Sequence, residues 1–213
     1  MCFLAMVGSA VYYSMNIIWP QQIDYLFPGS QINNGWLACL VGAGTLSGQI
    51  VGPLAIKLIT RTRLILMFIT LMLIAFSGAM LDINVGDRAK GAAFMFCSTF
   101  TVGVLETCVL SLAPLTCHPE DIGAALGALG SIRNGGSSIA SAIFTTILSN
   151  KLTKFIPEYV TTAAEAHGLP ASSLPALLGN LSTGELGNIP GINATIIAAV
   201  ELAEATGAAE SFK

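Results

Sequence analysis

The sequence predicts an all-α, multi-pass membrane protein, a bundle of five membrane-spanning helices. Its 213 residues are 54% hydrophobic and only 10% charged, whereas about a quarter of the residues of a soluble domain are charged. The mean hydropathy of +0.74 agrees with this composition. Charge-poor runs recur along the first 150 residues. A helix that rises ~1.5 Å per residue crosses a ~30 Å hydrocarbon core in about 20 residues, so these runs are long enough to span.

The first two runs predict spans over residues 2–19 and 34–58. The first run lacks a basic segment before it and a clear cleavage site after it, so we interpret it as a span and not as a signal peptide. Within the second run, Gly44, Gly48 and Gly52 recur at every fourth residue. Such a stripe lets the backbone of another helix approach closely, so these glycines predict helix packing.

Three further runs predict spans over residues 64–81, 91–117 and 122–148. Clusters of charged residues separate the second, third and fourth spans, as expected of loops in water. The fourth and fifth spans each carry one charge near their middle, Glu106 and Arg133. An ionised side chain at that depth needs a partner or a water-filled cavity.

The composition changes after residue 150. Residues 151–213 carry regular charges and four prolines, so we expect a water-exposed, extracellular segment of short helices and loops. Three basic residues in the 57–63 loop favour the cytoplasm for that side of the membrane. The glycosylation sequons at Asn180 and Asn193 need an extracytoplasmic tail. Five spans place this loop and the tail on opposite sides, so the two indications agree.

The positions of the two buried charges predict that they meet. Glu106 lies 13 residues before Pro119, and Arg133 lies 13 residues after Glu120. In an antiparallel hairpin both would sit at one depth, on the order of 16 Å in from the turn-side ends of the two spans. Two interpretations stay open at this point. The pair is either a structural lock between helices, or a site facing an aqueous cavity whose charge changes with proton or substrate binding.

Small and polar residues surround Arg133 on its helix. Gly123 and Gly127 form a Gly-x-x-x-Gly step and Gly136 continues it, which predicts close helix packing. Asn134 needs a polar partner within a span, so we include it with Arg133 in a candidate substrate or proton pathway.

No motif predicts an enzyme, a cofactor or a metal. His118 and His167 have no second ligand at metal spacing, and no Ser/His/Asp set or phosphate loop is visible. The five cysteines lie in or beside apolar segments, which is typical of packing residues. A net charge of −3 without a large basic cluster does not favour a nucleic-acid partner.

Two stretches resemble a known family. The run Tyr12 to Gln22 (YYSMNIIWPQQ) resembles the start of the C-terminal half of fungal major facilitator superfamily efflux pumps, in the branch of trichothecene efflux pumps and siderophore transporters. The run Gly127 to Lys151, with Gly-Ser-Ile-Arg followed by a glycine pair, resembles their penultimate span. The tail, with Gly168-Leu-Pro, resembles their long extracellular loop before the last span.

This resemblance implies a fold of two pseudo-symmetric six-helix halves around a central cavity. It also implies a multi-pass secondary active transporter, expected in the plasma membrane, that couples protons to the efflux of small organic molecules such as a toxin, drug or siderophore. In that frame Tyr12, Tyr13 and Asn16 would line the cavity together with Glu106.

The same resemblance predicts that the chain is a fragment. Its partners would be the lipid bilayer, a small-molecule substrate, and the missing N-terminal half and last helix of the transporter. The alternative is a small membrane protein that acts alone, as an oligomer or a channel subunit, because five spans with a soluble tail could fold independently.

Overall fold

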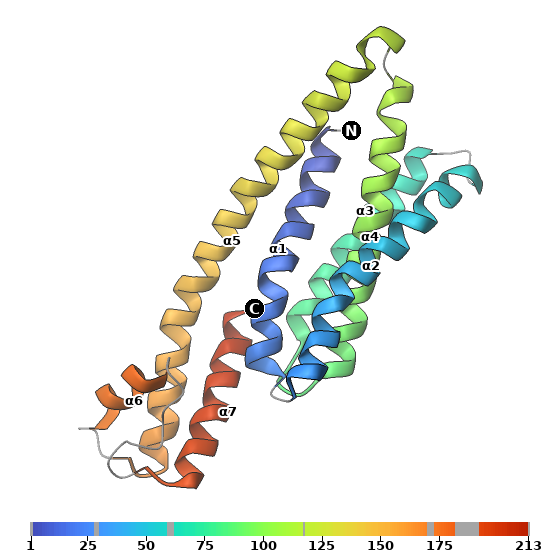
Figure 1. The fold of residues 1–213 in the computed structure, drawn as a ribbon. Helices are drawn as coiled ribbons and strands as arrows, with labels where there is room; N and C mark the ends of the chain where they lie inside the picture. The colour runs from blue at the N-terminus through green and yellow to red at the C-terminus, as the bar shows by residue number, and fades with distance from the viewer. Residues whose placement is uncertain are drawn as a thin grey trace.

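The computed structural model describes residues 2–27, 30–58, 62–116, 118–169, 173–181 and 192–212. Throughout these ranges the regular elements are helices, and none is a strand. Long helices lie side by side in an elongated bundle, and α1 lies between α5 and the group formed by α2, α3 and α4 (Figure 1). The all-α fold class is therefore confirmed.

The first two helices follow the first two predicted spans and extend beyond them. The helix α1 (Cys2–Leu26) continues seven residues past the predicted end at Trp19, with Pro20 inside it. The helix α2 (Gln31–Leu58) begins three residues before the predicted start and contains Pro53 near its end. Both proline positions lie within unbroken helix, so neither proline ends a span here.

The helix α3 (Thr62–Ala79) ends in a short 3-10 turn, η1 (Met80–Asp82), and α4 (Arg88–Leu112) follows. Gly86 adopts a φ of +90°, which glycine adopts without steric cost, and so turns the chain back into α4. This turn is attached to the end of α1. The Gly86 N–H donates to the Leu26 carbonyl at 3.2 Å, and Arg88 Nη2 donates to the Phe27 carbonyl at 2.8 Å.

Two 3-10 turns, η2 (Pro114–Thr116) and η3 (Pro119–Asp121), lead into α5 (Ile122–Ala166). The helix α5 continues for 18 residues beyond Leu148, the end of the predicted fifth span, and passes residue 150, where the composition changes. The helix has neither glycine nor proline between Gly136 and Pro157, so nothing local stops it there. Gly168, just beyond the end of α5 at Ala166, has a φ of +88° and caps the helix by donating its N–H to the Glu165 carbonyl at 3.0 Å.

The tail contributes two more helices, α6 (Leu174–Leu181) and α7 (Ala194–Ser211). The helix α7 packs against α5 and α1 (Figure 1). Its buried residues include Val200 and Ala208, both 0% exposed. Part of the tail is therefore docked on the bundle. The water exposure of residues 151–213 as a whole stays a prediction.

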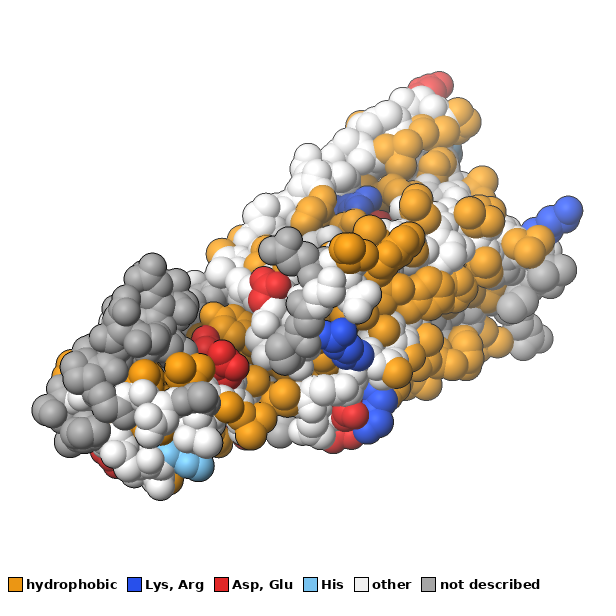
Figure 2. All heavy atoms as spheres, turned by 60° about the horizontal axis from the view of Figure 1, so that its bottom comes forward, with side chains coloured by type: hydrophobic (Ala, Val, Ile, Leu, Met, Phe, Trp, Pro, Cys, Tyr) orange, Lys and Arg blue, Asp and Glu red, His pale blue; other side chains and the backbone are white. Residues whose placement is uncertain are grey.

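Four helices in the described ranges are long and apolar enough to cross a membrane: α1, most of α2, α3 with η1, and α4. The predicted fifth span, 122–148, forms the first part of α5. Its many small and polar residues make α5 less apolar than those four helices, although its length would allow it to span. Its crossing of the bilayer stays a prediction. Hydrophobic side chains cover much of the face shown in Figure 2, as expected for contact with lipid.

Candidate functional site: a buried ion pair that joins three helices

Glu106 lies on the buried side of α4. The half of α4 around it is almost fully enclosed, and Glu106 itself is 7% exposed among neighbours such as Leu105 and Val109. A carboxylate in such apolar surroundings loses its hydration, so it needs a compensating charge and hydrogen bonds.

Arg133 of α5 supplies that charge. Its Nη2 lies 2.6 Å from Glu106 Oε1, and its Nε donates to Ser9 Oγ of α1 at 2.7 Å. The Ser9 hydroxyl in turn donates to the Ala5 carbonyl at 2.7 Å, and Ser9 is 0% exposed. We call Ser9, Glu106 and Arg133 the three-helix node. Within it the serine uses its hydroxyl both as acceptor and as donor.

The meeting of the two charges agrees with their predicted equal depth, but the surrounding helices are arranged differently from a closed hairpin. The helix α5 packs mainly on α1 and α7, whereas α4 packs mainly on α2 and α3. The Arg133 side chain therefore reaches past α1 to meet Glu106. Side-chain hydrogen bonds of the node, and not extended backbone packing, connect α4 to α5 at this depth.

The node is neutral overall and partly open. The Arg133 side chain is 22% exposed against 7% for Glu106, so the arginine is the less enclosed partner. Removing one partner of a buried ion pair typically costs about 3–5 kcal/mol, because the other charge is left uncompensated. The same energetics mean that a proton on Glu106 would weaken the attachment of Arg133.

The remaining predicted pathway residues do not join the node. Tyr13 is 41% exposed, and its ring meets that of Tyr12 edge-on with 5.4 Å between centroids. Asn16 is exposed and donates from Nδ2 to the Tyr12 carbonyl at 3.0 Å. Asn134 is also exposed, and its backbone carbonyl accepts hydrogen bonds from the hydroxyl groups of Ser137 and Ser138.

The predicted packing glycines differ in whether a neighbouring element lies close to them. Gly44, Gly48 and Gly52 face α4, where a Cβ added to Gly44 or Gly48 would collide with Thr99 or with the Phe100 backbone, and one on Gly52 would lie 3.1 Å from Thr107. Gly136 faces the Met6 side chain of α1. Gly123 and Gly127 have no atom within 4 Å of an added Cβ, so the described residues supply no partner for that step. Of the sequons, Asn193 is exposed just before α7, while the side chain of Asn180 lies outside the described part.

A cavity of about 380 Å³ lies between α1, α3, α4, α5 and the end of α7. Its wall combines apolar side chains such as Trp19 and Phe144 with polar groups, including Gln22 and Lys151. Gln22 is 6% exposed, and its Oε1 has no hydrogen-bond partner among the described residues. The sequence alone does not indicate this cavity, because its lining comes from five helices that are far apart along the chain.

No three His, Cys, Asp or Glu side chains gather into a metal site within the ranges that the structure describes. The chemistry available at the node is therefore that of a carboxylate and a guanidinium. It consists of charge pairing, hydrogen bonding and, at Glu106, binding of a proton.

Comparison with known proteins gives one family. The sequence model of the fungal trichothecene efflux pump family (TRI12) matches residues 1–213. Trichothecene efflux pump TRI12 of Fusarium sporotrichioides is 24% identical over 98% of this chain and 36% of its own length. The MFS-type transporter prx5 of Penicillium rubens is 23% identical over 92% of this chain and 37% of its own.

Trichothecene efflux pump TRI12 of Trichoderma arundinaceum is 26% identical over 70% of this chain and 26% of its own length. The chain thus spans about a third of the length of these curated relatives. No solved structure matches the chain.

Proposed function

Since this chain belongs to the fungal trichothecene efflux pump family, we propose that it is the C-terminal portion of a transporter that exports small organic molecules in exchange for protons. The complete protein would then contain a further bundle and lie in the plasma membrane. Toxins, drugs and siderophores are the substrate classes that we propose for it. The single observation that carries a mechanism is the three-helix node.

In this proposal Glu106 is the proton-binding group. When it is ionised, Arg133 bridges α4 and α5 and keeps Ser9 of α1 in the same network. A proton on Glu106 removes the charge that holds the guanidinium. Because α4 and α5 share little direct packing, the loss of this bridge would let α5 move relative to α4.

The cavity of about 380 Å³ supports the same function. Binding sites for small organic molecules are mostly apolar, with a few placed polar groups that fix orientation. Trp19 and Phe144 provide the apolar wall, and Gln22 and Lys151 provide polar groups on α1 and α5. These are two of the helices that the node connects, so substrate binding and proton binding would act on the same pair of elements.

The test uses the full-length protein reconstituted in vesicles, with Glu106→Gln as the variant. We expect export driven by a pH gradient to fall at least tenfold, because the amide cannot exchange a proton. Substrate exchange without a gradient should persist, since it does not require net proton movement. Glu158→Gln on the exposed side of α5 is the matched control and should leave both rates unchanged.

Unchanged gradient-driven export in Glu106→Gln would reject the coupling role. The charge-exchanged pair, Glu106→Arg with Arg133→Glu, separates coupling from a lock. If the node is only a structural lock, this double variant should restore both folding and gradient-driven export.

A further inference from the structure

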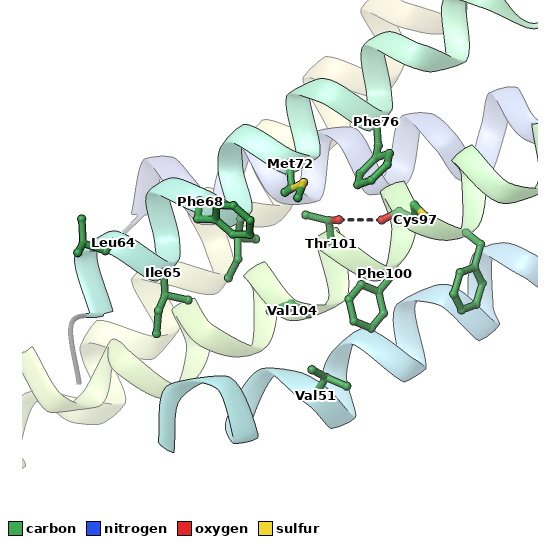
Figure 3. Close-up of a pocket in the computed structure, with 12 residues that line it drawn as sticks. Val51, Leu64, Ile65, Phe68, Met72, Phe76, Cys97, Phe100, Thr101 and Val104 are labelled. Atoms are coloured by element: carbon green, nitrogen blue, oxygen red, sulfur yellow. Dashed lines mark hydrogen bonds between the residues drawn. The ribbon is translucent and has the colours of Figure 1, made fainter. Parts of the chain in front are cut away.

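We propose that the groove between α2 and α3 binds an anionic phospholipid, with an acyl chain in the groove and the phosphate held by Lys57 and Arg63. The groove has a volume of about 640 Å³. Its walls are Val51 of α2 and the α3 residues from Leu64 to Phe76, and α4 forms its floor (Figure 3). This site is separate from the three-helix node and does not depend on the transport activity.

The residues that line the groove favour a hydrocarbon ligand over a polar one. Apart from Thr101 and the Cys97 thiol, every lining residue is apolar. The Thr101 hydroxyl already donates to the Cys97 carbonyl at 2.7 Å, which Figure 3 shows as the dashed line. A polar ligand would therefore find no free strong donor in the groove, whereas an alkyl chain needs none.

The length of the groove matches one leaflet of a bilayer. Leu64 and Phe76 lie near its two ends in Figure 3 and are twelve residues apart on α3. That separation corresponds to ~18 Å of helix. Half of a ~30 Å hydrocarbon core is about 15 Å, so one acyl chain of a lipid would extend along the whole groove.

Two basic residues lie at one end of the groove. Arg63 directly precedes Leu64, and Lys57 is at the end of α2, on the same side of the bundle. Both side chains are exposed, and neither forms an ion pair with any residue that the structure describes. A lipid whose tail fills the groove would place its phosphate at this level. Basic groups between spans at the cytoplasmic surface are suited to anionic headgroups, and the 57–63 loop is the side that we expect in the cytoplasm.

A helix is a poorer occupant than an acyl chain. Close helix contacts in membranes rely on small residues, as α2 shows where Gly44 and Gly48 meet α4. The α2–α3 groove has no glycine or alanine among its lining residues and is walled by phenylalanine, leucine, isoleucine and methionine. Flexible, bulky side chains of this kind accommodate a conformationally mobile chain.

The test measures lipid retained by the purified full-length protein, by native mass spectrometry after incubation with dioleoyl phosphatidylserine or dioleoyl phosphatidylcholine. We expect wild type to retain the serine lipid preferentially. Lys57→Gln with Arg63→Gln should reduce that preference by about tenfold or more, since each basic residue near a membrane surface contributes roughly a fivefold gain. Lys154→Gln, which removes an exposed charge on α5, is the control.

Val51→Trp should fill the groove and remove retention of both lipids. Its control is Ile50→Trp, which places the same side chain on the adjacent, 77% exposed position outside the groove lining. Equal retention by wild type and Val51→Trp would overturn the proposal. A change of oligomeric state in Val51→Trp, with lipid retention unaltered, would overturn it in favour of a second copy of the chain on this face.

Discussion

Ser9 carries the smallest side chain of the three-helix node and has two tasks there. Its oxygen accepts the Arg133 Nε–H while its hydroxyl hydrogen satisfies the Ala5 carbonyl. An alanine at this position would fit sterically but would leave a partly buried guanidinium N–H without a partner. Leaving a buried donor unsatisfied costs more than the hydrogen bond itself contributes.

We therefore expect Ser9→Ala to lower the free energy of unfolding by about 1–3 kcal/mol. The measurement is thermal unfolding in detergent. Ser131→Ala is the control, because Ser131 is exposed and its hydroxyl bonds only within its own helix. Equal stability of the two variants would show that the serine is not a required member of the node.

Glu204 is a titratable residue on α7, outside the predicted spans, whose environment changes its pKa. Burial of α7 against the bundle raises the pKa of Glu204 above its usual value, and the nearby Glu201 carboxylate raises it further. The docked state therefore binds the proton more tightly than the unfolded state does. Docking of α7 is then strongest below the usual carboxyl pKa and weakens as the pH rises through the raised value.

Hydrogen exchange of α7 amides, corrected for intrinsic rates, tests this between about pH 4 and 7. We expect protection to fall as the pH rises in wild type and to stay level in Glu204→Gln. Glu158→Gln, an exposed change on α5, should keep the wild-type slope. A persistent slope in Glu204→Gln would assign the pH dependence to another group.

Among the described helices, α2 and α4 share the most extensive packing, with glycines at the contact. Backbone meets backbone there, since Cβ atoms added to Gly48 and Gly103 would collide with the Phe100 and Thr45 carbonyl oxygens. Backbone atoms cannot move aside as a flexible side chain can. The α2–α4 pair therefore requires glycine at these positions.

The chain offers a matched pair of substitutions on α2. Gly48→Ala should separate α2 from α4 and destabilise the protein by about 1–3 kcal/mol, as overpacking does. Gly42→Ala, with no atom within 4 Å, should be neutral or slightly stabilising, because alanine favours helix by about 1 kcal/mol over glycine. Thermal unfolding of both variants decides, and a Gly48→Ala protein as stable as Gly42→Ala would contradict the need for glycine at this contact.

The sequence predicts the helices but not all their ends. Charge-poor runs locate α1 to α4 because the cost of burying charge decides where a span lies. The same reasoning does not locate the end of α5, because the composition changes at residue 150, whereas the helix continues to Ala166, just before the capping glycine Gly168. The docking of α7 depends on contacts with α5 and α1, which no local pattern in the tail encodes.

The candidate site is predictable to a similar degree. Glu106 and Arg133 can be found because isolated charges within spans are rare and their depths match. Ser9 cannot be found in this way, since hydroxyl residues are common in these helices and Ser9 lies 124 positions from Arg133 in sequence. The position of α1 between α4 and α5 is also not predictable in this way, because counting residues from the turn of a hairpin gives no information about a third helix.

In the complete transporter, we expect proton binding to be linked to movement of helices. The node connects α1, α4 and α5 through side chains, and the cavity of about 380 Å³ borders the same three helices. Substrate in the cavity and a proton on Glu106 would then bias one conformational equilibrium. Such linkage is reciprocal, so binding of substrate must change proton binding.

The decisive quantity is therefore the number of protons that the purified, full-length transporter exchanges with a weakly buffered solution when it binds substrate. We expect a change of about one proton per substrate in wild type and none in Glu106→Gln, because one carboxyl group accounts for the linkage. The same proton change in both proteins would contradict the proposed role of Glu106, since another group would then carry the coupling.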